Sequence, residues 1–286
     1  MKTPLDLSGF RMPAEWEPHE ATWLTWPHRE EHWPGKFQIT HPIWARMVKE
    51  LESGEEVHLL IHDDATEKIA KEAMRTAGVT GRQVHLHRVP NNYAWARDHG
   101  PIFVKNGKDR LILNWQFNGW GNKWEHDLDN EVPLHVSKIT GIPAQNVPMV
   151  LEGGSIDVNG QGTLLTTEAC LLNKNRNPHL SKSQIEEFLK THLGVSTIIW
   201  LGEGIVGDDT DGHVDDMTRF VNPTTVVTAV EEDPADENYK ILKENFNRLK
   251  KTGLTVAPLP MPGPVLYEGE RLPASYANFY IGNKVV

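Results

Sequence analysis

Cysteine is nearly absent from this sequence. Its 286 residues contain one, Cys170. A single cysteine cannot form an internal disulfide, and a thiolate zinc site needs more than one. The sequence therefore excludes a disulfide-stabilised scaffold and predicts a cytoplasmic protein.

Basic residues are also fewer than acidic ones. Lysine and arginine together number 29 against 39 aspartates and glutamates, which gives a formal net charge of -10. Nucleic-acid phosphates require the opposite sign, so the balance argues against nucleic acid and favours a small cation as the ligand.

Long apolar runs are missing as well. No stretch approaches the roughly 20 apolar residues that span a bilayer, and the first ten residues have no apolar segment of the kind that signal peptides carry. We therefore expect no contact with a membrane.

Local patterns predict an α/β protein in which strands alternate with helices. Turn residues separate short β-rich runs, and four longer amphipathic segments carry helix-start or helix-stop signals. The predicted strands cover 20–26, 57–62, 83–89, 102–104, 111–115, 163–167, 217–221, 225–230 and 279–281. The predicted helices begin at His41 with Pro42 in the first turn, at Asp63 or Asp64, at Ser183 and at Asp233.

A polar residue recurs at the start of successive hairpin segments. The intervals are 54 residues from Asp98 to Glu152, 61 from Glu152 to His213 and 65 from His213 to Asn278. A unit of hairpin, helix and strand that recurs about every 60 residues indicates a repeat arranged around an axis, as propeller blades are. An open α/β sheet with coincidental spacing is the alternative.

The most unusual stretch is 207–216, in which five carboxylates and a histidine lie within ten residues. Such a cluster is either a solvated acidic turn or a site whose repulsion a cation relieves. On an extended backbone, His213 and Asp215 would share one face while Val214 points into the core. This alternation favours a general acid/base beside a cation anchor.

A planar cation would suit the hydrogen-bonding groups of Asp98, Glu152, Asp215 and His213. A guanidinium presents five donors in a fixed fork that carboxylates accept, and a histidine could protonate a departing amine and then activate water. The rival hypothesis is a divalent metal bound by Asp209, Asp211, His213 and Asp215. Trp95 and Trp120 lie beside polar loop residues and suggest an aromatic wall for the ligand.

Six segments then show a family resemblance: MPAEWEPHEATWLTWP (12–27), NNYAWARDHGPIFV (91–104), FNGWGNKW (117–124), LEGGSIDVNGQGTLLTTEACLLNKNRNP (151–178), GDDTDGHVDDMTRFV (207–221) and LPASYANFYI (272–281). They resemble the agmatine deiminase and bacterial-type peptidylarginine deiminase family of the pentein superfamily. The resemblance extends over nearly the whole chain, and its motifs are long and collinear.

The resemblance implies a five-bladed propeller of ββαβ units, forming one domain over residues 1–286, and hydrolysis of a guanidino group without a cofactor or a metal. It implies that Asp98 and Asp215 bind the guanidinium, that Glu152 supports the site and that His213 is the acid/base. The residues expected near the substrate are Trp95, Asn118, Gly119, Trp120, Asp209 and Asn278.

The sequence departs from the family at the nucleophile. In the family this is a cysteine near the C-terminus in a Gly-rich His-Cys context, whereas Cys170 reads as a small buried hydrophobe. Either the native protein continues beyond Val286, with the C-terminal part of the propeller missing here, or the chain is a non-catalytic guanidine-binding derivative. We favour the first.

Two substrates remain open for a catalytic member. One is agmatine, converted to N-carbamoylputrescine and ammonia in putrescine biosynthesis, and the other is peptidyl arginine. The second requires a cation for the substrate's carboxylate, and the segment FNGWGNKW offers only Lys123. The sequence also leaves a homo-oligomer open.

Overall fold

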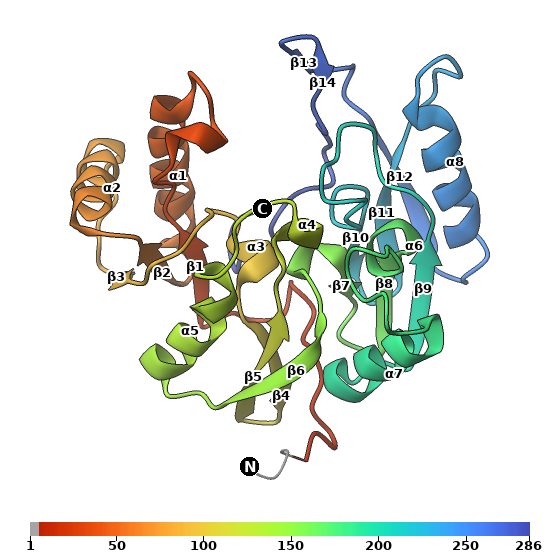
Figure 1. The fold of residues 1–286 in the computed structure, drawn as a ribbon, viewed down its shortest axis with the longest axis horizontal. Coiled ribbons are helices and arrows are strands. Elements are labelled where there is room, and N and C mark those ends of the chain that lie inside the picture. Colours follow the sequence, from red (N-terminus) through yellow and green to blue (C-terminus); the bar gives the residue numbers. More distant parts are fainter. Residues whose placement is uncertain (1–5) are drawn as a thin grey trace.

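Most strands belong to four three-stranded sheets, and a short hairpin adds two more (Figure 1). The computed structural model describes residues 6–286. Residues 1–5, part of the N-terminal stretch without an apolar signal segment, lie outside the described residues. Among the described residues, no helix combines the length and the apolar character needed to cross a membrane.

Three of the sheets repeat one topology, a hairpin followed by a helix and a strand parallel to the hairpin's second strand. The first such unit contains β4 (Ile102–Asn106), β5 (Asp109–Gln116), α5 (Val132–Thr140) and β6 (Ala144–Val150). The next contains β7 (Asp157–Val158), β8 (Thr163–Thr167), α7 (Lys182–Leu193) and β9 (Thr197–Leu201). The last contains β10 (Thr218–Asn222), β11 (Thr225–Val230), α8 (Asn238–Leu249) and β12 (Thr255–Pro260). The predicted repeat of hairpin, helix and strand is therefore confirmed.

The N-terminal sheet is built differently. Its strands β1 (Ala21–Thr25), β2 (Glu56–Ile61) and β3 (Val84–Arg88) are all parallel, because helices α1 (Phe37–Leu51) and α2 (Asp64–Ala77) form both connections. Alternate β2 residues Val57, Leu59 and Ile61 pack with apolar residues of both helices. The opposite face of β2 presents His58 and Leu60.

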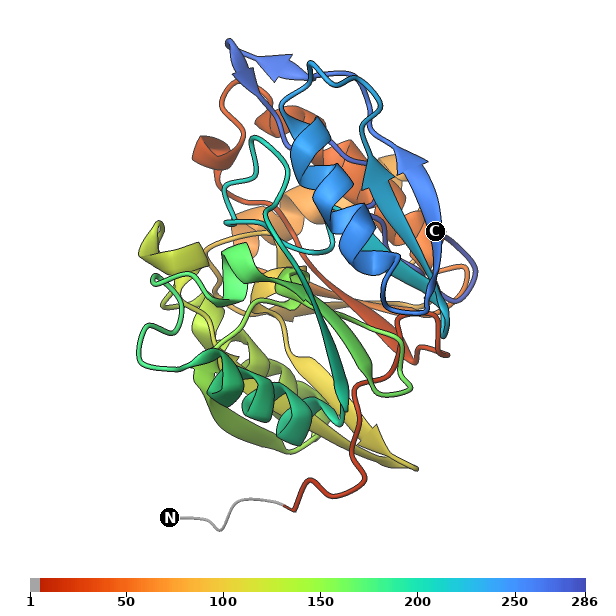
Figure 2. The same ribbon diagram turned by 90° about the vertical axis from the view of Figure 1, so that its right-hand side faces the viewer.

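The helices of the four units lie at the periphery of the molecule, and Figure 2 shows α8 running across its own sheet. Short turns connect the strand ends near the centre: η1 (Glu30–His32), α3 (Ala96–His99), α4 (Gly119–Asn122), η2 (Asp129–Glu131), η3 (Gly153–Ser155) and α6 (Glu168–Leu171). Asp98, Gly119 and Trp120 lie within these turns, and Trp95, Asn118 and Glu152 directly precede them.

Several predicted helix boundaries are wrong. Helix α1 begins at Phe37, so Pro42 lies inside it, and the Phe37 ring packs edge-on against His41 4.7 Å away. This contact joins residues four apart in the same helix, so a local interaction accompanies the extra turn that the position of the proline did not predict. Ile43 and Met47, expected on the buried face, are exposed, whereas Ala45 and Val48 are buried.

The ends of the other helices confirm two predicted capping residues and correct two predicted helix starts. Asp63 caps α2 by accepting the Thr66 N–H, and Gly78 ends it with a positive φ of 75°, as predicted. Helix α7 is capped by Ser181 with Gln184, two residues before the predicted start. Helix α8 begins at Asn238, not at Asp233.

The predicted strand at 279–281 is absent, and the described C-terminal segment binds to other units through side chains. The Ile281 N–H donates to Glu15, and the Asn283 N–H donates to Glu55 at 2.7 Å. Val285 packs against the core of the N-terminal sheet. A hairpin that was not predicted, β13 (Leu266–Tyr267) with β14 (Glu270–Arg271), precedes this segment.

Candidate active site

Four predicted site residues meet at the ends of strands from different units. Asp98 lies in α3 after β3, Glu152 follows β6, and His213 and Asp215 lie between β9 and β10. His213 Nδ1 is 3.7 Å from Asp98 Oδ1 and 4.0 Å from Asp215 Oδ1. The ligating atoms of Glu152 and His213 lie within 4.8 Å of each other. Residues separated by 117 positions in the chain thus form one buried cluster.

Gly154 is the close packing partner that brings two of these side chains together. Its N–H donates to Asp98 Oδ1 at 3.1 Å, and its carbonyl accepts the Asp215 N–H at 3.3 Å. A Cβ at this position would lie 2.5 Å from His213 Nδ1 and 2.7 Å from Asp98 Oδ1. Only glycine leaves room for the imidazole and the carboxylate here.

Asp208 determines the shape of the acidic segment. Its carboxylate accepts the N–H groups of Thr210 at 2.8 Å, Gly212 at 2.9 Å and His213 at 3.1 Å. The backbone at 213–217 is consequently a turn, and strand β10 begins only at Thr218. The prediction of an extended backbone is wrong, although Val214 is buried and the side chains of its two neighbours do share the site.

Other carboxylates of this segment are neutralised by cations of the protein itself. Asp211 pairs with Arg176 at 2.6 Å and with Lys123 at 2.8 Å, and Arg176 also pairs with Glu152 at 2.6 Å. The carbonyl of Asp209, in the exposed part of the loop, accepts from Lys123. Asp211 is therefore turned toward Arg176 and Lys123, and the structure does not gather the four residues of the metal hypothesis.

The electrostatics of the cluster favour a charged histidine. Burial alone lowers the pKa of His213, but Asp98, Cys170 and Asp215 together outweigh it and raise that pKa well above its usual value. Burial raises the pKa of Asp215 against the opposing effects of His213 and Arg97. Burial, with the neighbouring charges of Asp215 and Asp208, raises the pKa of Asp216 to about 8. The site thus holds an imidazolium beside carboxyl groups that a cation would help to ionise.

Two buried polar atoms remain available for a ligand. His213 Nε2 and Asp215 Oδ1 have no hydrogen-bond partner among the described residues. Buried polar groups without a partner are costly in a folded protein and are a frequent mark of a functional site. The unpaired oxygen of Asp215 is an acceptor for a ligand that carries N–H groups, whereas Nε2 of a protonated His213 is a donor.

Trp120 joins the aromatic wall to the polar cluster. Its Nε1–H donates to Asp98 Oδ2 at 3.1 Å. The ring packs edge-to-face on Tyr93 and Phe117, with centroids 5.2 and 5.0 Å away. Trp95, 39% exposed, lies with its ring centroid 6.0 Å from that of Trp120. The wall therefore fixes one oxygen of Asp98 and leaves a partly open indole beside it.

A strained turn presents Trp120, whose φ is 55°, a left-handed value that tryptophan rarely adopts. Asn118 supports the turn by accepting the Gly121 N–H and donating to the Asn175 carbonyl, both at 2.9 Å. Gly119 also has a positive φ, and a Cβ there would lie 2.3 Å from the Trp124 carbonyl oxygen. Backbone strain of this kind is concentrated at functional sites.

Asn278 comes from the C-terminal segment. Its amide donates to Asp216 Oδ1 at 2.8 Å, next to the main cluster. Asp216 itself was not among the predicted site residues. Because Asp216 adjoins Asp215 in a segment already recognised as acidic, the local charge density could have identified it.

Cys170 lies closer to the site than the sequence suggested. It is fully buried, as predicted, but its Sγ is 3.9 Å from Glu152 Oε2. Burial and the negative charge of Glu152 raise the pKa of the thiol. A protonated, inaccessible thiol is a poor nucleophile.

Two further residues escaped the sequence analysis. Arg176 is buried and links Glu152 to Asp211. Glu15 binds Arg219 at 2.7 Å and also pairs with Arg97, which confirms Arg97 as the partner of a carboxylate. Arg176 lies within the family-like segment 151–178, and Glu15 lies within the family-like segment 12–27.

The fold and the site define an α/β protein with a largely buried cluster of carboxylates around one histidine. The chain belongs to the Porphyromonas-type peptidyl-arginine deiminase family, whose sequence pattern it matches over residues 11–286. This family membership makes it a hydrolase of guanidino C–N bonds.

Three relatives illustrate the similarity. The agmatine deiminase of Ectopseudomonas mendocina is 36% identical over 307 residues, which cover 96% of this chain and 82% of that protein. A cysteine-to-serine variant of C. jejuni agmatine deiminase, solved with substrate bound, is 36% identical with a TM-score of 0.88, covering 96% of this chain and 80% of that one. The agmatine deiminase of Enterococcus faecalis is 32% identical with a TM-score of 0.88, covering 99% and 84%.

Proposed function

We propose that this protein is an agmatine deiminase, which hydrolyses the guanidino group of agmatine to N-carbamoylputrescine and ammonia. The observation that carries the proposal is a buried cluster of Asp98, Glu152, His213 and Asp215 in which His213 Nε2 and Asp215 Oδ1 have no partner among the described residues. Relatives that are named agmatine deiminases, 80–84% of whose length this chain covers, support the same conclusion.

In this proposal Asp98 and Asp215 hold the guanidinium through charge-assisted hydrogen bonds. The Gly154 N–H and the Trp120 Nε1–H each bind one oxygen of Asp98, so this carboxylate is oriented before the substrate arrives. Glu152 is fixed by Arg176, and its carboxylate lies within 4.8 Å of a ring nitrogen of His213. Such an arrangement places the guanidinium carbon for attack without a large reorganisation of the protein.

The reaction proceeds in two steps. A cysteine thiolate attacks the guanidinium carbon, His213 donates its proton to the departing nitrogen, and ammonia leaves to give a covalent thiouronium. Water then attacks the same carbon while the now neutral His213 accepts its proton. The carbon–sulfur bond breaks as the second proton of the attacking water passes to the released ammonia or to solvent, which releases the ureido product and restores the thiolate. A raised pKa suits His213 to the first, acidic role.

Cys170 does not fit the role of the nucleophile in this mechanism, because its thiol is buried and has a raised pKa. Cys170 instead contacts Glu152 and contributes to the packing of the site.

The proposed preference for agmatine over arginine follows from the ion pairs that the cationic side chains near the site already form. Arg176 is paired with Glu152 and Asp211, Lys123 with Asp211, and Arg97 with Glu15. None of these three is free to receive the carboxylate of arginine, and an unpaired buried carboxylate is costly. The distal ammonium of agmatine would instead be attracted by the negative charge and could stack on the half-exposed Trp95.

The test is the ratio of kcat/KM for agmatine to that for arginine and for a peptidyl arginine, measured at two salt concentrations, with binding of agmatine followed by calorimetry. We expect a preference for agmatine that shrinks as salt rises. Equal or better turnover of peptidyl arginine would identify the second candidate function.

We further infer that the units form a five-bladed ring within a single domain over residues 1–286. The described C-terminal segment supports this, because Asn278 binds Asp216 beside the last complete unit and Asn283 binds His19 and Glu55 of the N-terminal one. The net charge of -10 supports a small cationic partner in preference to nucleic acid, and the low cysteine content supports a cytoplasmic location. The assembly state, a homo-oligomer or a monomer, can be measured by light scattering.

A further inference from the structure

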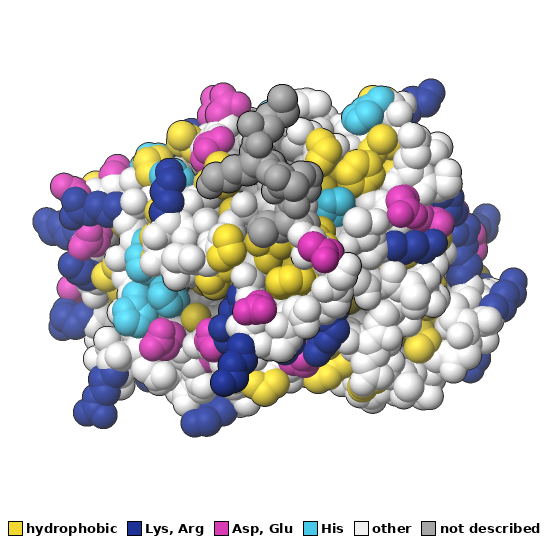
Figure 3. Space-filling model, turned by 90° about the horizontal axis from the view of Figure 1, so that it is seen from below, with side chains coloured by type: hydrophobic (Ala, Val, Ile, Leu, Met, Phe, Trp, Pro, Cys, Tyr) yellow, Lys and Arg dark blue, Asp and Glu magenta, His cyan; other side chains and the backbone are white. Residues whose placement is uncertain are grey.

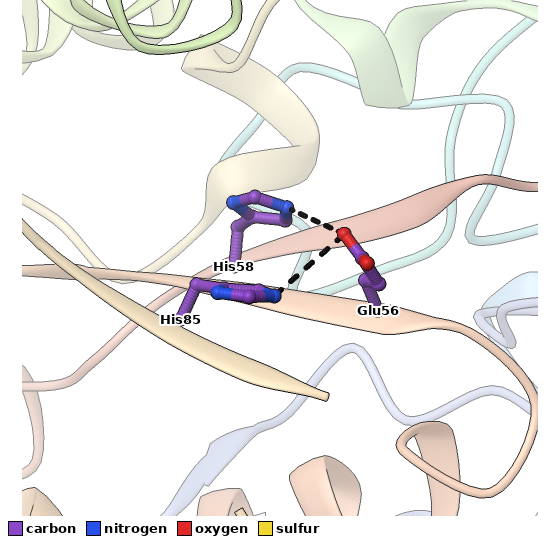
Figure 4. Close-up of side chains that lie close together, drawn as sticks. All are labelled: Glu56, His58 and His85. Atoms are coloured by element: carbon purple, nitrogen blue, oxygen red, sulfur yellow. Dashed lines mark ion pairs between the residues drawn. The ribbon is translucent and has the colours of Figure 1, made fainter. Parts of the chain in front are cut away.

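A second cluster of chemically capable side chains lies on the N-terminal sheet, outside the proposed active site. Glu56 and His58 are two residues apart on β2 and therefore share a face. The parallel register places His85 of β3 directly beside His58. Figure 4 shows both imidazoles directed toward the Glu56 carboxylate. Strand pairing thus brings one carboxylate and two imidazoles together.

The distances within this cluster match those of metal ligands. His58 Nε2 and His85 Nε2 are each 3.6 Å from the same Glu56 oxygen, and the three ligating atoms lie within 4.8 Å of one another. Two ligands at about 2.1 Å from a tetrahedral zinc are roughly 3.4 Å apart. Small rotations of exposed side chains would close the remaining difference.

A further histidine orients the ligand on β2. His58 Nδ1 and His87 Nε2 are 2.8 Å apart, so His87 can accept a proton carried on Nδ1, and in that tautomer the Nε2 lone pair faces Glu56. Trp23 stacks on His58 with centroids 4.3 Å apart and limits rotation of the ring. Metal-binding histidines characteristically use their second nitrogen in this way.

The cluster is open to solution. The side chains of Glu56 and His85 are 53% and 45% exposed, and that of His58 is 16% exposed. Figure 3 shows histidines gathered on the side of the molecule that β1–β3 and their helices form. The other close group of potential ligands among the described residues, Glu152, Cys170 and His213, is fully buried, and its carboxylate is already paired with Arg176. Only the group on the sheet combines suitable ligands with access.

We propose that Glu56, His58 and His85 form a binding site for a divalent transition metal ion of the zinc type, with His87 as the residue that positions His58. Two imidazoles and one carboxylate are a common protein ligand set for zinc, with the fourth position left to water. A bound ion would connect β2 to the neighbouring β3 and stabilise the folded state. This site is independent of the proposed deiminase activity.

The experiment is calorimetric titration of the whole protein with Zn²⁺, together with Co²⁺ absorption spectra and thermal unfolding with and without Zn²⁺. We expect one equivalent of Zn²⁺ to bind and raise the Tm, and Co²⁺ to give the intense visible bands of a tetrahedral site. His85→Ala and Glu56→Gln should each weaken Zn²⁺ binding by at least about tenfold, and His87→Ala, which removes only the positioning residue, by roughly 10- to 100-fold.

His179→Ala is the matched control, because His179 is an exposed histidine in another unit. It should bind Zn²⁺ as the unchanged protein does. Glu56→Gln keeps the size of a half-exposed side chain, so its Tm without metal shows whether the fold is intact. The proposal is overturned if the unchanged protein binds no Zn²⁺, or if Glu56→Gln and His85→Ala both bind it as tightly as the His179→Ala control.

Discussion

Gly154→Ala should inactivate the enzyme while leaving it folded. The new Cβ would lie 2.5 Å from His213 Nδ1 and 2.7 Å from Asp98 Oδ1. To restore ordinary contacts of at least 3.4 Å, the imidazole must move by about 0.9 Å and the carboxylate by about 0.7 Å, and a misplacement of this size costs on the order of 10²-fold in rate. Overpacking of this kind costs about 1–3 kcal/mol of stability, which a domain of this size can tolerate.

The assay compares kcat/KM for agmatine with the Tm for Gly154→Ala and for Gly263→Ala. Gly263 is the matched control, since a Cβ there meets nothing within 4 Å and its φ is not in the left-handed range. We expect a fall of about 10²-fold or more in kcat/KM for Gly154→Ala alone, with a modest decrease in Tm. Full activity in Gly154→Ala would refute the assignment of His213 and Asp98 to the reacting centre.

Four further predictions follow from the same geometry. His213→Ala should lower kcat by about 10²-fold or more with little change in agmatine binding, as steady-state kinetics and calorimetry would show; an unchanged kcat would place the acid/base elsewhere. Asp98→Asn and Asp215→Asn should each weaken agmatine binding in a titration, whereas activity that a chelator abolishes and added metal restores would favour the metal hypothesis instead. Cys170→Ala should retain turnover of agmatine, because Cys170 is not expected to be the nucleophile. If this variant is stably folded but forms no covalent intermediate, Cys170 is the nucleophile. The pKa of Asp216 is raised to about 8, so in the free protein this carboxyl group carries a proton at neutral pH, which a bound cation displaces. Agmatine affinity should therefore rise between about pH 6 and pH 8. Asp216→Asn should flatten this pH dependence if Asp216 is the group that releases the proton.

The repeated unit was predictable because its signals are local. Turn residues at 105–108 and 159–160 separate runs with strand character, and both positions are hairpin turns in the structure. The N-terminal sheet was not predictable in the same way. Its parallel pairing depends on helices that return the chain across the sheet and on contacts between strands that are far apart in the sequence.

The positions of Asp98, Glu152 and His213 could be inferred because each occupies the same place in successive units. The groups that fix them could not, since their partners are distant in the sequence. Arg176 is 24 residues from Glu152, and Arg219 is 204 residues from Glu15. Spacing identifies side chains that face a common axis, but it does not tell which of the surrounding charges are already paired.

That pairing is what distinguishes an anionic binding site from an acidic turn. Asp211 and Glu152 share Arg176, which relieves their repulsion and holds both rigidly. Asp215 has only two more distant cations, Arg97 with its Nε 3.9 Å away and His213 with its Nδ1 4.0 Å away, and one of its oxygens lacks a hydrogen-bond partner among the described residues. Removing one member of a buried ion pair is strongly destabilising, so a buried carboxylate without a close cationic partner lowers the free energy of unfolding. A guanidinium ligand, which offers donors to this oxygen and a positive charge to its neighbours, removes that destabilisation, and the free energy so gained favours binding of the cation at this position and orientation.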